Sequence, residues 1–144
     1  MAYPDILLIP MREDLTRVGV IETRTPEAVD QMLAPGSGTV LMITNSVCGC
    51  AAGKARPAIA AALQHTTKPD KAASVFAGGD VEAVAYLRSK YLADYPVSSP
   101  CMAIFQDGKP VYYMSRMQIE SQGPAQIAAD LKAAFEKYCA VTKQ

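Results

Sequence analysis

The sequence has no excess of charge of either sign: among its 144 residues, 14 are Lys or Arg and 14 are Asp or Glu. A protein that binds nucleic acid needs a basic face to neutralise phosphates, so we expect no nucleic acid among the partners. No apolar run approaches the roughly 18 residues that a membrane span requires. The first five residues contain no basic side chain, so the apolar residues 6–9 do not form a secretory signal. These absences predict a soluble cytoplasmic protein with no membrane partner.

Internal repeats, low-complexity tracts and long Gly/Ser linkers are absent as well. A chain of this length is expected to form one domain, residues 1–144, and to bury a core without stabilising disulfides. The segment Gly36-Ser37-Gly38 precedes a predicted strand instead of joining a strand to a helix, which excludes a phosphate-binding loop. Four cysteines are present, and in a cytosolic chain of this size they favour catalysis, metal binding or simple burial over a disulfide framework.

Apolar periodicity and turn residues predict an α/β fold. The predicted elements are, in order, helices over 5–18 and 26–34, a strand over 39–44, a helix over 51–64, a strand over 72–77, a helix over 81–91, strands over 101–105 and 111–114, and a helix over 124–140. Pro10 interrupts or starts the first helix, Thr25 and Asp80 are expected to cap helices through their side chains, and Asp107-Gly108 predicts a hairpin. This order, a βαβ unit and then a ββα unit after an N-terminal helical extension, resembles the thioredoxin-like fold, with a central mixed β-sheet flanked by helices.

The segment Cys48-Gly49-Cys50 lies where the first strand of the βαβ unit gives way to its helix. Free backbone amides at a helix start stabilise a thiolate, which is the nucleophilic form of cysteine. Lys54 and Arg56 follow closely and are expected to add positive potential. Gly49 lacks a Cβ atom, so we expect it to allow a sharp turn and the approach of another chain to the sulfur. The pattern therefore predicts thiol–disulfide chemistry at this corner.

Two mechanisms remain open at this point. In one, Cys48 attacks a mixed disulfide and Cys50 resolves it, forming a transient bridge that would be strained and therefore oxidising because only one residue separates the two. In the other, Cys48 works alone, and a small thiol or a partner protein resolves the intermediate.

The remaining cysteines and the histidine have simpler interpretations. In a thioredoxin-like fold Cys101 would lie beside Cys48, where it could bond the thiolate, act as a second resolving thiol or help to hold a metal, but a small buried residue without a redox role is favoured. Cys139 lies on the apolar stripe of the last helix and predicts core packing. His65 is expected about 20 Å from Cys48, near the far end of the helix, which argues against a Cys-His catalytic pair. A closed zinc site needs four ligands, and Cys48, Cys50 and Cys101 supply only three.

The stretch Asn45-Ser46-Val47-Cys48-Gly49-Cys50-Ala51-Ala52-Gly53-Lys54-Ala55-Arg56-Pro57 resembles the signature of the bacilliredoxin family, and residues 10–15, 75–80 and 95–100 extend the resemblance. The resemblance implies a thioredoxin-like fold and thiol–disulfide exchange that removes bacillithiol from S-bacillithiolated cytosolic proteins, with weaker disulfide isomerase activity. It implies Cys48 as the attacking thiol and Cys50 as the resolving or auxiliary one. It also implies a cis-proline at Pro100 that shapes the substrate groove. The residues that we expect to bind substrate around the two cysteines are Ser46, Gly49, Ser99, Pro100 and Cys101.

Two positions depart from the family pattern. Family members usually have Ser where this chain has Cys101, and they often carry His within the segment that here spans residues 116–120. Bacillithiol would be a co-substrate, and we expect neither an organic cofactor nor a metal. Three alternatives remain: a general disulfide reductase or isomerase that uses glutathione or thioredoxin, a metal or iron–sulfur protein that uses Cys48, Cys50 and Cys101, and a redox-inert interaction module. The oligomeric state is left open.

Overall fold

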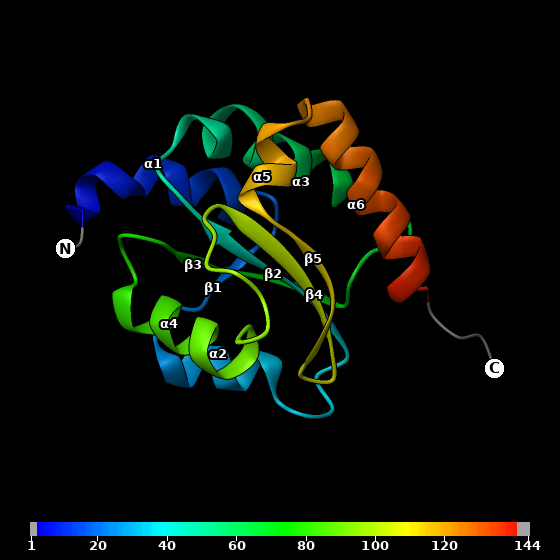
Figure 1. Ribbon diagram of the computed structural model, residues 1–144, viewed down its shortest axis with the longest axis horizontal. Coiled ribbons are helices and arrows are strands. Elements are labelled where there is room, and N and C mark those ends of the chain that lie inside the picture. The colour runs from blue at the N-terminus through cyan, green and yellow to red at the C-terminus, as the bar shows by residue number, and fades with distance from the viewer. Residues whose placement is uncertain (1–2, 141–144) are drawn as a thin grey trace.

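A computed structural model describes residues 3–140 and places a five-stranded sheet at the centre of the molecule (Figure 1). The strands are β1 (Ile21–Glu22), β2 (Thr39–Asn45), β3 (Lys71–Phe76), β4 (Cys101–Gln106) and β5 (Lys109–Met114), in the spatial order β1-β3-β2-β4-β5. β1 and β2 run parallel to β3, whereas β4 runs antiparallel to β2 and β5 antiparallel to β4. The mixed sheet predicted from the order of elements is therefore confirmed.

Helices cover both faces of this sheet (Figure 1). On one face lie α1 (Asp5–Thr16), α3 (Arg56–Ala62), α5 (Arg116–Glu120) and α6 (Pro124–Tyr138); on the other lie α2 (Pro26–Leu33) and α4 (Val81–Tyr86). A π-helical turn, η1 (Ala51–Ala55), precedes α3, and a second one, η2 (Leu87–Tyr91), follows α4. Because side chains alternate along a strand, Leu41 and Ile43 of β2 join the core under α3 and α6, while Val40 and Met42 join the core over α2 and α4.

Local sequence signals account for several of these elements. The Thr25 hydroxyl accepts a hydrogen bond of 3.1 Å from the amide of Ala28 and caps α2, as predicted. Asp107 and Gly108 both have positive φ, as the two-residue turn between β4 and β5 requires. α1 continues through Pro10, which neither starts nor ends it. β1 and α5 were not predicted, because two and five residues are too few to show a period.

The prediction that the Asp80 carboxylate caps α4 is wrong. Its oxygens accept hydrogen bonds from Arg12 at 2.8 and 3.1 Å, from Arg24 at 3.3 Å and from the Phe76 amide at 3.0 Å. Asp80 and Arg12 are both buried, and Arg12 also bonds Glu22 of β1 at 2.7 Å. A carboxylate beside two guanidinium groups is better stabilised by their charge than by free helix amides. Asp80 therefore ties α1 to the corner between β3 and α4.

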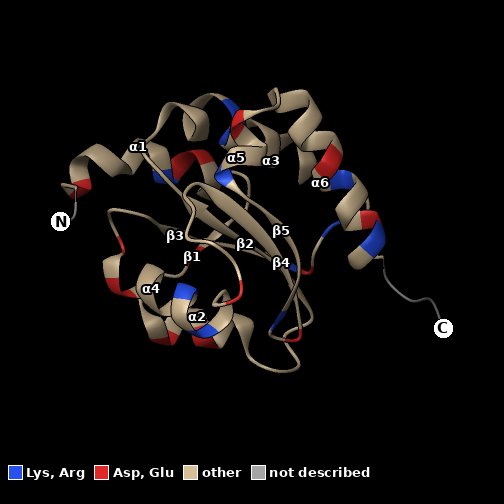
Figure 2. Cartoon of the chain, in the orientation of Figure 1, with Lys and Arg blue, Asp and Glu red and all other residues tan. Residues whose placement is uncertain are grey.

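Acidic and basic residues are interspersed over the helices of both faces (Figure 2). Within residues 3–140, none of the helices has the length and apolar character that crossing a membrane requires.

Replacing Asp80 with Asn is expected to lower the free energy of unfolding by about 3 kcal/mol, because the change leaves the buried Arg12 without its carboxylate. Denaturant unfolding of the purified variant measures this change. The matched control is Asp94→Asn at an exposed position, where we expect a change below about 0.5 kcal/mol. Equal stabilities of the two variants would show that the buried pair does not hold α1 to the sheet.

Candidate active site

The corner between β2 and η1 is held by the buried side chain of Arg56. Its Nη1 donates to Asn45 Oδ1 and to the Ser46 carbonyl, both at 2.9 Å, and its Nε donates to Asp14 at 3.0 Å. Asn45 in turn donates from Nδ2 to the Met11 carbonyl at 3.2 Å. Because these bonds join α1, the end of β2 and the start of α3, the segment between β2 and α3 has little freedom. Cys48 and Cys50 lie in that segment.

The helix that follows the cysteines begins with a π-helical turn. The Arg56 amide bonds the Ala51 carbonyl, five residues earlier. Pro57 has no N–H to donate and would crowd the carbonyl of Gly53 in a regular α-helix, so the wider turn accommodates it. The carbonyl of Cys48 accepts bonds from the amides of Ala51 and Ala52 at 3.1 and 3.2 Å, which closes the first turn over the dithiol.

The two thiols of the corner ionise unequally. Partial burial opposes ionisation of Cys48, but the Cys50 thiol, the Ala51 amide, the Ser46 hydroxyl and the Cys50 amide favour its thiolate and lower its pKa below the ordinary 9.0. Burial and the neighbouring Cys48 thiolate raise the pKa of Cys50. Both side chains are partly exposed. Cys48 is therefore the more readily ionised of the two thiols, and Cys50 the one that keeps its proton longer.

Neither Lys54 nor Arg56 is among the groups with the largest effects on the pKa of Cys48 or Cys50. Lys54 Nζ donates to the Glu120 carbonyl at 2.6 Å, and Arg56 is buried among its acceptors at the strand end. The cation whose charge acts on both cysteines is Arg116, at the start of α5. Sequence reasoning missed this residue. The capping box of Ser115 and Gln118, with bonds of 2.8 and 3.3 Å, is the signal that could have located α5 and hence Arg116.

The cis-proline loop lies at the same edge of the sheet. Thr44 of β2 pairs with Cys101 of β4 in antiparallel register, so the residues just before Cys101 lie beside those just after Thr44. The Ser99–Pro100 peptide bond is cis, as the resemblance implied. The Ser99 carbonyl accepts a bond of 3.4 Å from Arg116 Nη1, and the Ser98 hydroxyl accepts one of 2.7 Å from the Arg116 amide. The loop and α5 are thereby joined.

A groove of about 620 Å³ lies between this loop and α5; its lining residues are Pro96, Val97, Ser98, Ser99, Ser115, Arg116, Met117 and Glu120. Val97 and Met117 are largely exposed on its rim. Lys54 of η1 donates to the carbonyl of Glu120, which lines the groove, so the groove lies beside the turn that follows Cys48 and Cys50. Arg116 and Glu120 both act on the pKa of Cys50. It offers apolar contacts, hydroxyl groups and a cation next to the sulfur atoms.

The predicted substrate-binding residues are not all brought together. Ser99 lines the groove, whereas Ser46 is buried with its hydroxyl against Cys48. Gly49 is not among the glycines with positive φ, so its conformation does not require a glycine. A Cβ atom there would meet nothing within 4 Å, which leaves room for an approaching chain. Pro100 is buried beneath the loop. Their contacts with substrate stay predictions.

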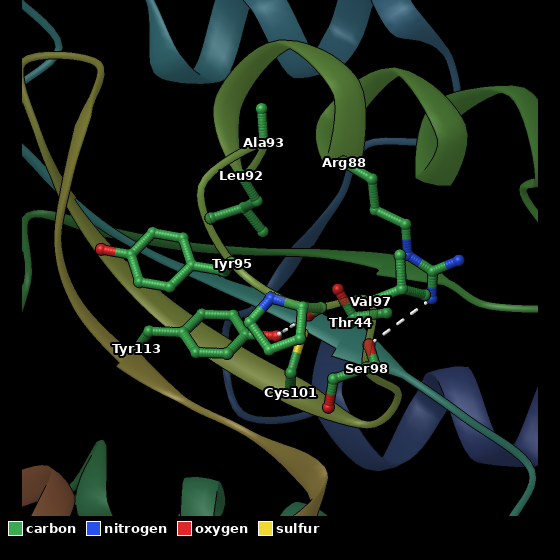
Figure 3. A pocket seen from close by; sticks show the side chains of 10 residues that line it. Thr44, Arg88, Leu92, Ala93, Tyr95, Val97, Ser98, Cys101 and Tyr113 are labelled. Carbon is green, nitrogen blue, oxygen red and sulfur yellow. Dashed lines mark hydrogen bonds between the residues drawn. The ribbon is translucent and has the colours of Figure 1, made fainter.

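Cys101 lies apart from the dithiol. It is buried and lines a separate cavity of about 100 Å³ with Thr44, Arg88 and Tyr113 (Figure 3). It also shares the odd-numbered side of β4 with Ala103 and Phe105, which pack toward α2 and α4. Burial raises the pKa of its thiol. The groups around it that affect this pKa are Thr44, Tyr113 and Arg88, and the two active-site cysteines are not among them.

The metal-binding alternative needs Cys48, Cys50 and Cys101 as ligands of one site. Because Cys101 lies apart from the other two, that set of three ligands does not form. Within residues 3–140, the structure has no group of three or more His, Cys, Asp or Glu side chains that could hold a metal ion. His65 lies beyond α3 and pairs with Glu136 of α6 at 2.6 Å. Cys139 packs in the core, as predicted, and burial raises the pKa of its thiol to about 11.

Known proteins resemble this chain over nearly its whole length. The sequence profile of the disulphide isomerase family matches residues 3–139. A bacilliredoxin of Salinibacter ruber is 50% identical over 140 residues, covering 96% of this chain and 81% of its own length. A bacilliredoxin of Koribacter versatilis is 48% identical, covering 97% and 96%. The chain belongs to the bacilliredoxin family.

Solved structures show the same fold as in this bacilliredoxin-family chain. A mutant thioredoxin from Halobacterium salinarum superposes with a TM-score of 0.60 over 88% of this chain and 96% of its own, at 19% identity. A thioredoxin from Malassezia sympodialis gives a TM-score of 0.58 over 84% and 91%, at 15% identity. The fold is therefore thioredoxin-like. Together with the bacilliredoxin relatives, it makes the protein a thiol–disulfide oxidoreductase.

Alkylation of the reduced protein by iodoacetamide is expected to follow the thiolate of Cys48. Because its pKa is lowered, half-maximal reactivity of Cys48 should occur at a lower pH than that of an unperturbed cysteine in a short peptide measured alongside. Cys50→Ala removes the thiol donor and should move the midpoint up, whereas Cys50→Ser keeps a donor and should move it less. A midpoint unchanged by Cys50→Ala would show that this thiol does not stabilise the Cys48 thiolate.

Cys101→Ser is expected to leave the rate of disulfide exchange within about twofold of the wild-type rate, because the side chain is buried away from the dithiol. Stopped-flow reduction of a model disulfide by the reduced protein measures the rate. The comparison variant is Cys48→Ser, which should lose exchange. A loss in Cys101→Ser comparable to that in Cys48→Ser, in a folded protein, would place Cys101 in the reaction.

Proposed function

We propose that the protein reduces mixed disulfides between bacillithiol and cysteines of cytosolic proteins, with Cys48 as nucleophile and Cys50 as resolving thiol. The observation that carries this proposal is the unequal pair of thiols, one stabilised as a thiolate by the other, next to a groove formed by the cis-proline loop. The bacilliredoxin names of the relatives support the choice of small thiol.

In the first step the Cys48 thiolate attacks the bacillithiol sulfur of the mixed disulfide. A bond forms between these two sulfur atoms, the original disulfide bond breaks, and the client cysteine leaves as a thiolate that takes a proton from water. The Ala51 and Cys50 amides at the helix start and the Ser46 hydroxyl stabilise the attacking sulfur in its thiolate form. Client cysteine is reduced, and Cys48 carries bacillithiol.

In the second step Cys50 resolves this intermediate. Once Cys48 is in a disulfide, it no longer carries the negative charge that raises the pKa of Cys50, so Cys50 ionises more readily. Its thiolate attacks the Cys48 sulfur, releases bacillithiol as a thiolate and leaves a Cys48–Cys50 disulfide, which two further thiol molecules reduce while they become a disulfide themselves. In the shorter route, a second bacillithiol attacks the bound one, forms bacillithiol disulfide and restores Cys48 directly. In both routes the mixed disulfide gains two electrons, and the thiols that end as a disulfide supply them.

Bacillithiol is thus a co-substrate in this proposal, and no resident cofactor takes part. The disulphide isomerase family profile supports a secondary isomerase activity. In that reaction Cys48 attacks a protein disulfide and is expelled by another client cysteine. A general disulfide reductase that uses glutathione is the competing hypothesis.

The test is intact mass spectrometry after mixing reduced protein with a bacillithiolated client and, in parallel, with the same client glutathionylated. We expect Cys50→Ser to trap bacillithiol on Cys48 and Cys48→Ser to release no client thiol. Preference for the bacillithiolated client by tenfold or more would establish the proposed substrate. Equal turnover of both clients would favour the general reductase, and transfer from neither would overturn the proposal.

A further inference from the structure

The groove beside the dithiol contains a half-exposed guanidinium group, that of Arg116. Its backbone amide is fixed to the Ser98 hydroxyl at 2.7 Å, and Nη1 reaches the Ser99 carbonyl at 3.4 Å. Its Nε bonds Glu120 at 3.0 Å, one turn further along α5. The side chain is therefore held across the groove between the cis-proline loop and α5.

This guanidinium group has capacity for a ligand. An Arg side chain presents five N–H donors in a planar fork that matches a carboxylate. In the part of the chain that the structure describes, the acceptors bonded to the side chain are the Glu120 carboxylate at Nε and the Ser99 carbonyl at Nη1. The Nη2 donors have no such acceptor. The Ser99 and Ser115 side chains line the same groove and add hydroxyl groups nearby.

The position of Arg116 next to the sulfur atoms decides what it can recognise. α5 is bonded to the turn after the cysteines through Lys54 and Glu120, and Arg116 itself is bonded to the cis-proline loop, so its side chain lies at the edge where the substrate disulfide is attacked. Its charge acts on both cysteines. A substrate group that binds Arg116 must therefore lie only a few covalent bonds from the disulfide. It can belong either to the small thiol or to the client residue next to the cysteine. Glu120 is half-exposed and shares the same guanidinium group, so it competes with an incoming anion without filling the groove.

We propose that Arg116 and the serine hydroxyl groups beside it form a carboxylate-binding subsite, through which the enzyme prefers mixed disulfides that carry a carboxylate near the reacting sulfur. The inference rests on the proposed disulfide exchange and adds a specificity determinant to it. Arg116 would bind the substrate carboxylate through its free donors, with Glu120 weakening that preference by competition.

The experiment uses one peptide with a single cysteine, presented as mixed disulfides with three small thiols of similar size: 3-mercaptopropionate, 2-mercaptoethanol and cysteamine. At neutral pH the free groups of these small thiols are anionic, neutral and cationic, respectively. A second series keeps 2-mercaptoethanol and places Glu, Gln or Lys next to the peptide cysteine. For each mixed disulfide, the second-order rate constant for reduction by the protein is divided by the rate constant for reduction by dithiothreitol. This ratio corrects for the intrinsic reactivity of the disulfide. The two series separate a carboxylate on the small thiol from one on the client.

At low ionic strength we expect the anionic substrate of at least one series to react about fivefold faster than the cationic one, the scale of one ion pair in water. Salt should reduce this ratio. Arg116→Gln should bring it close to one, Arg116→Lys should restore it in part, and Glu120→Gln should raise it. Lys109→Gln, an exposed charge loss at the far end of β5, is the matched control and should leave it unchanged.

A substrate ratio near one in the wild type, in both series, would overturn the subsite. An equal loss of rate with all three small thiols in Arg116→Gln would also overturn the subsite, because that result assigns Arg116 to stabilising the Cys48 thiolate alone. If Arg116→Gln does not fold, the test is the ratio of anionic to cationic substrate rates in Glu120→Gln. A ratio equal to that of the wild type would contradict the proposal. Failure of the wild type to reduce any of the disulfides would instead contradict the proposed function.

Discussion

The buried guanidinium of Arg56 is the interaction on which the active corner depends. A cation removed from water is tolerated only when acceptors surround it, and here Asn45, the Ser46 carbonyl and Asp14 do so. Those acceptors belong to β2, the segment that follows it and α1, while Arg56 itself begins α3. One side chain therefore fixes the angle between strand and helix at the point where Cys48 and Cys50 lie.

That geometry makes the two cysteines chemically different. The chain turns so that the Cys50 thiol, the amides of Ala51 and Cys50 and the Ser46 hydroxyl all favour the ionised form of one thiol, that of Cys48. Two thiolates so close together would repel each other, so stabilising the first disfavours the second. The motif thus supplies one nucleophile, Cys48, and one thiol, Cys50, that ionises less readily. α5 completes the site, since it is bonded both to the helix after the motif, through Lys54, and to the cis-proline loop, through Arg116.

Much of the fold could be predicted because its signals are local. The positive φ of Asp107 and Gly108, the capping hydroxyl of Thr25 and the apolar stripe that ends at Cys139 each depend on a few neighbouring residues. The errors involve residues whose partners are distant in the sequence. Asp80 was predicted to cap the adjacent helix, but Arg12, 68 residues earlier, takes its carboxylate. Lys54 and Arg56 follow the cysteines in sequence, yet the cation that acts on both sulfur atoms comes from residue 116.

The sequence by itself determined the α/β order, the mixed sheet and the placement of a two-cysteine motif at a strand-to-helix corner, because hydrophobic period and turn residues are properties of short segments. Tertiary structure alone decided which thiol ionises, which cation faces it and which cysteine is set apart. Cys101 shows the reason: it directly follows the proline of the site, but alternation along β4 directs its side chain into a separate cavity, on the side of β4 from which Ala103 and Phe105 pack toward α2 and α4. Electrostatic interactions depend on distance in space, which only the folded chain defines.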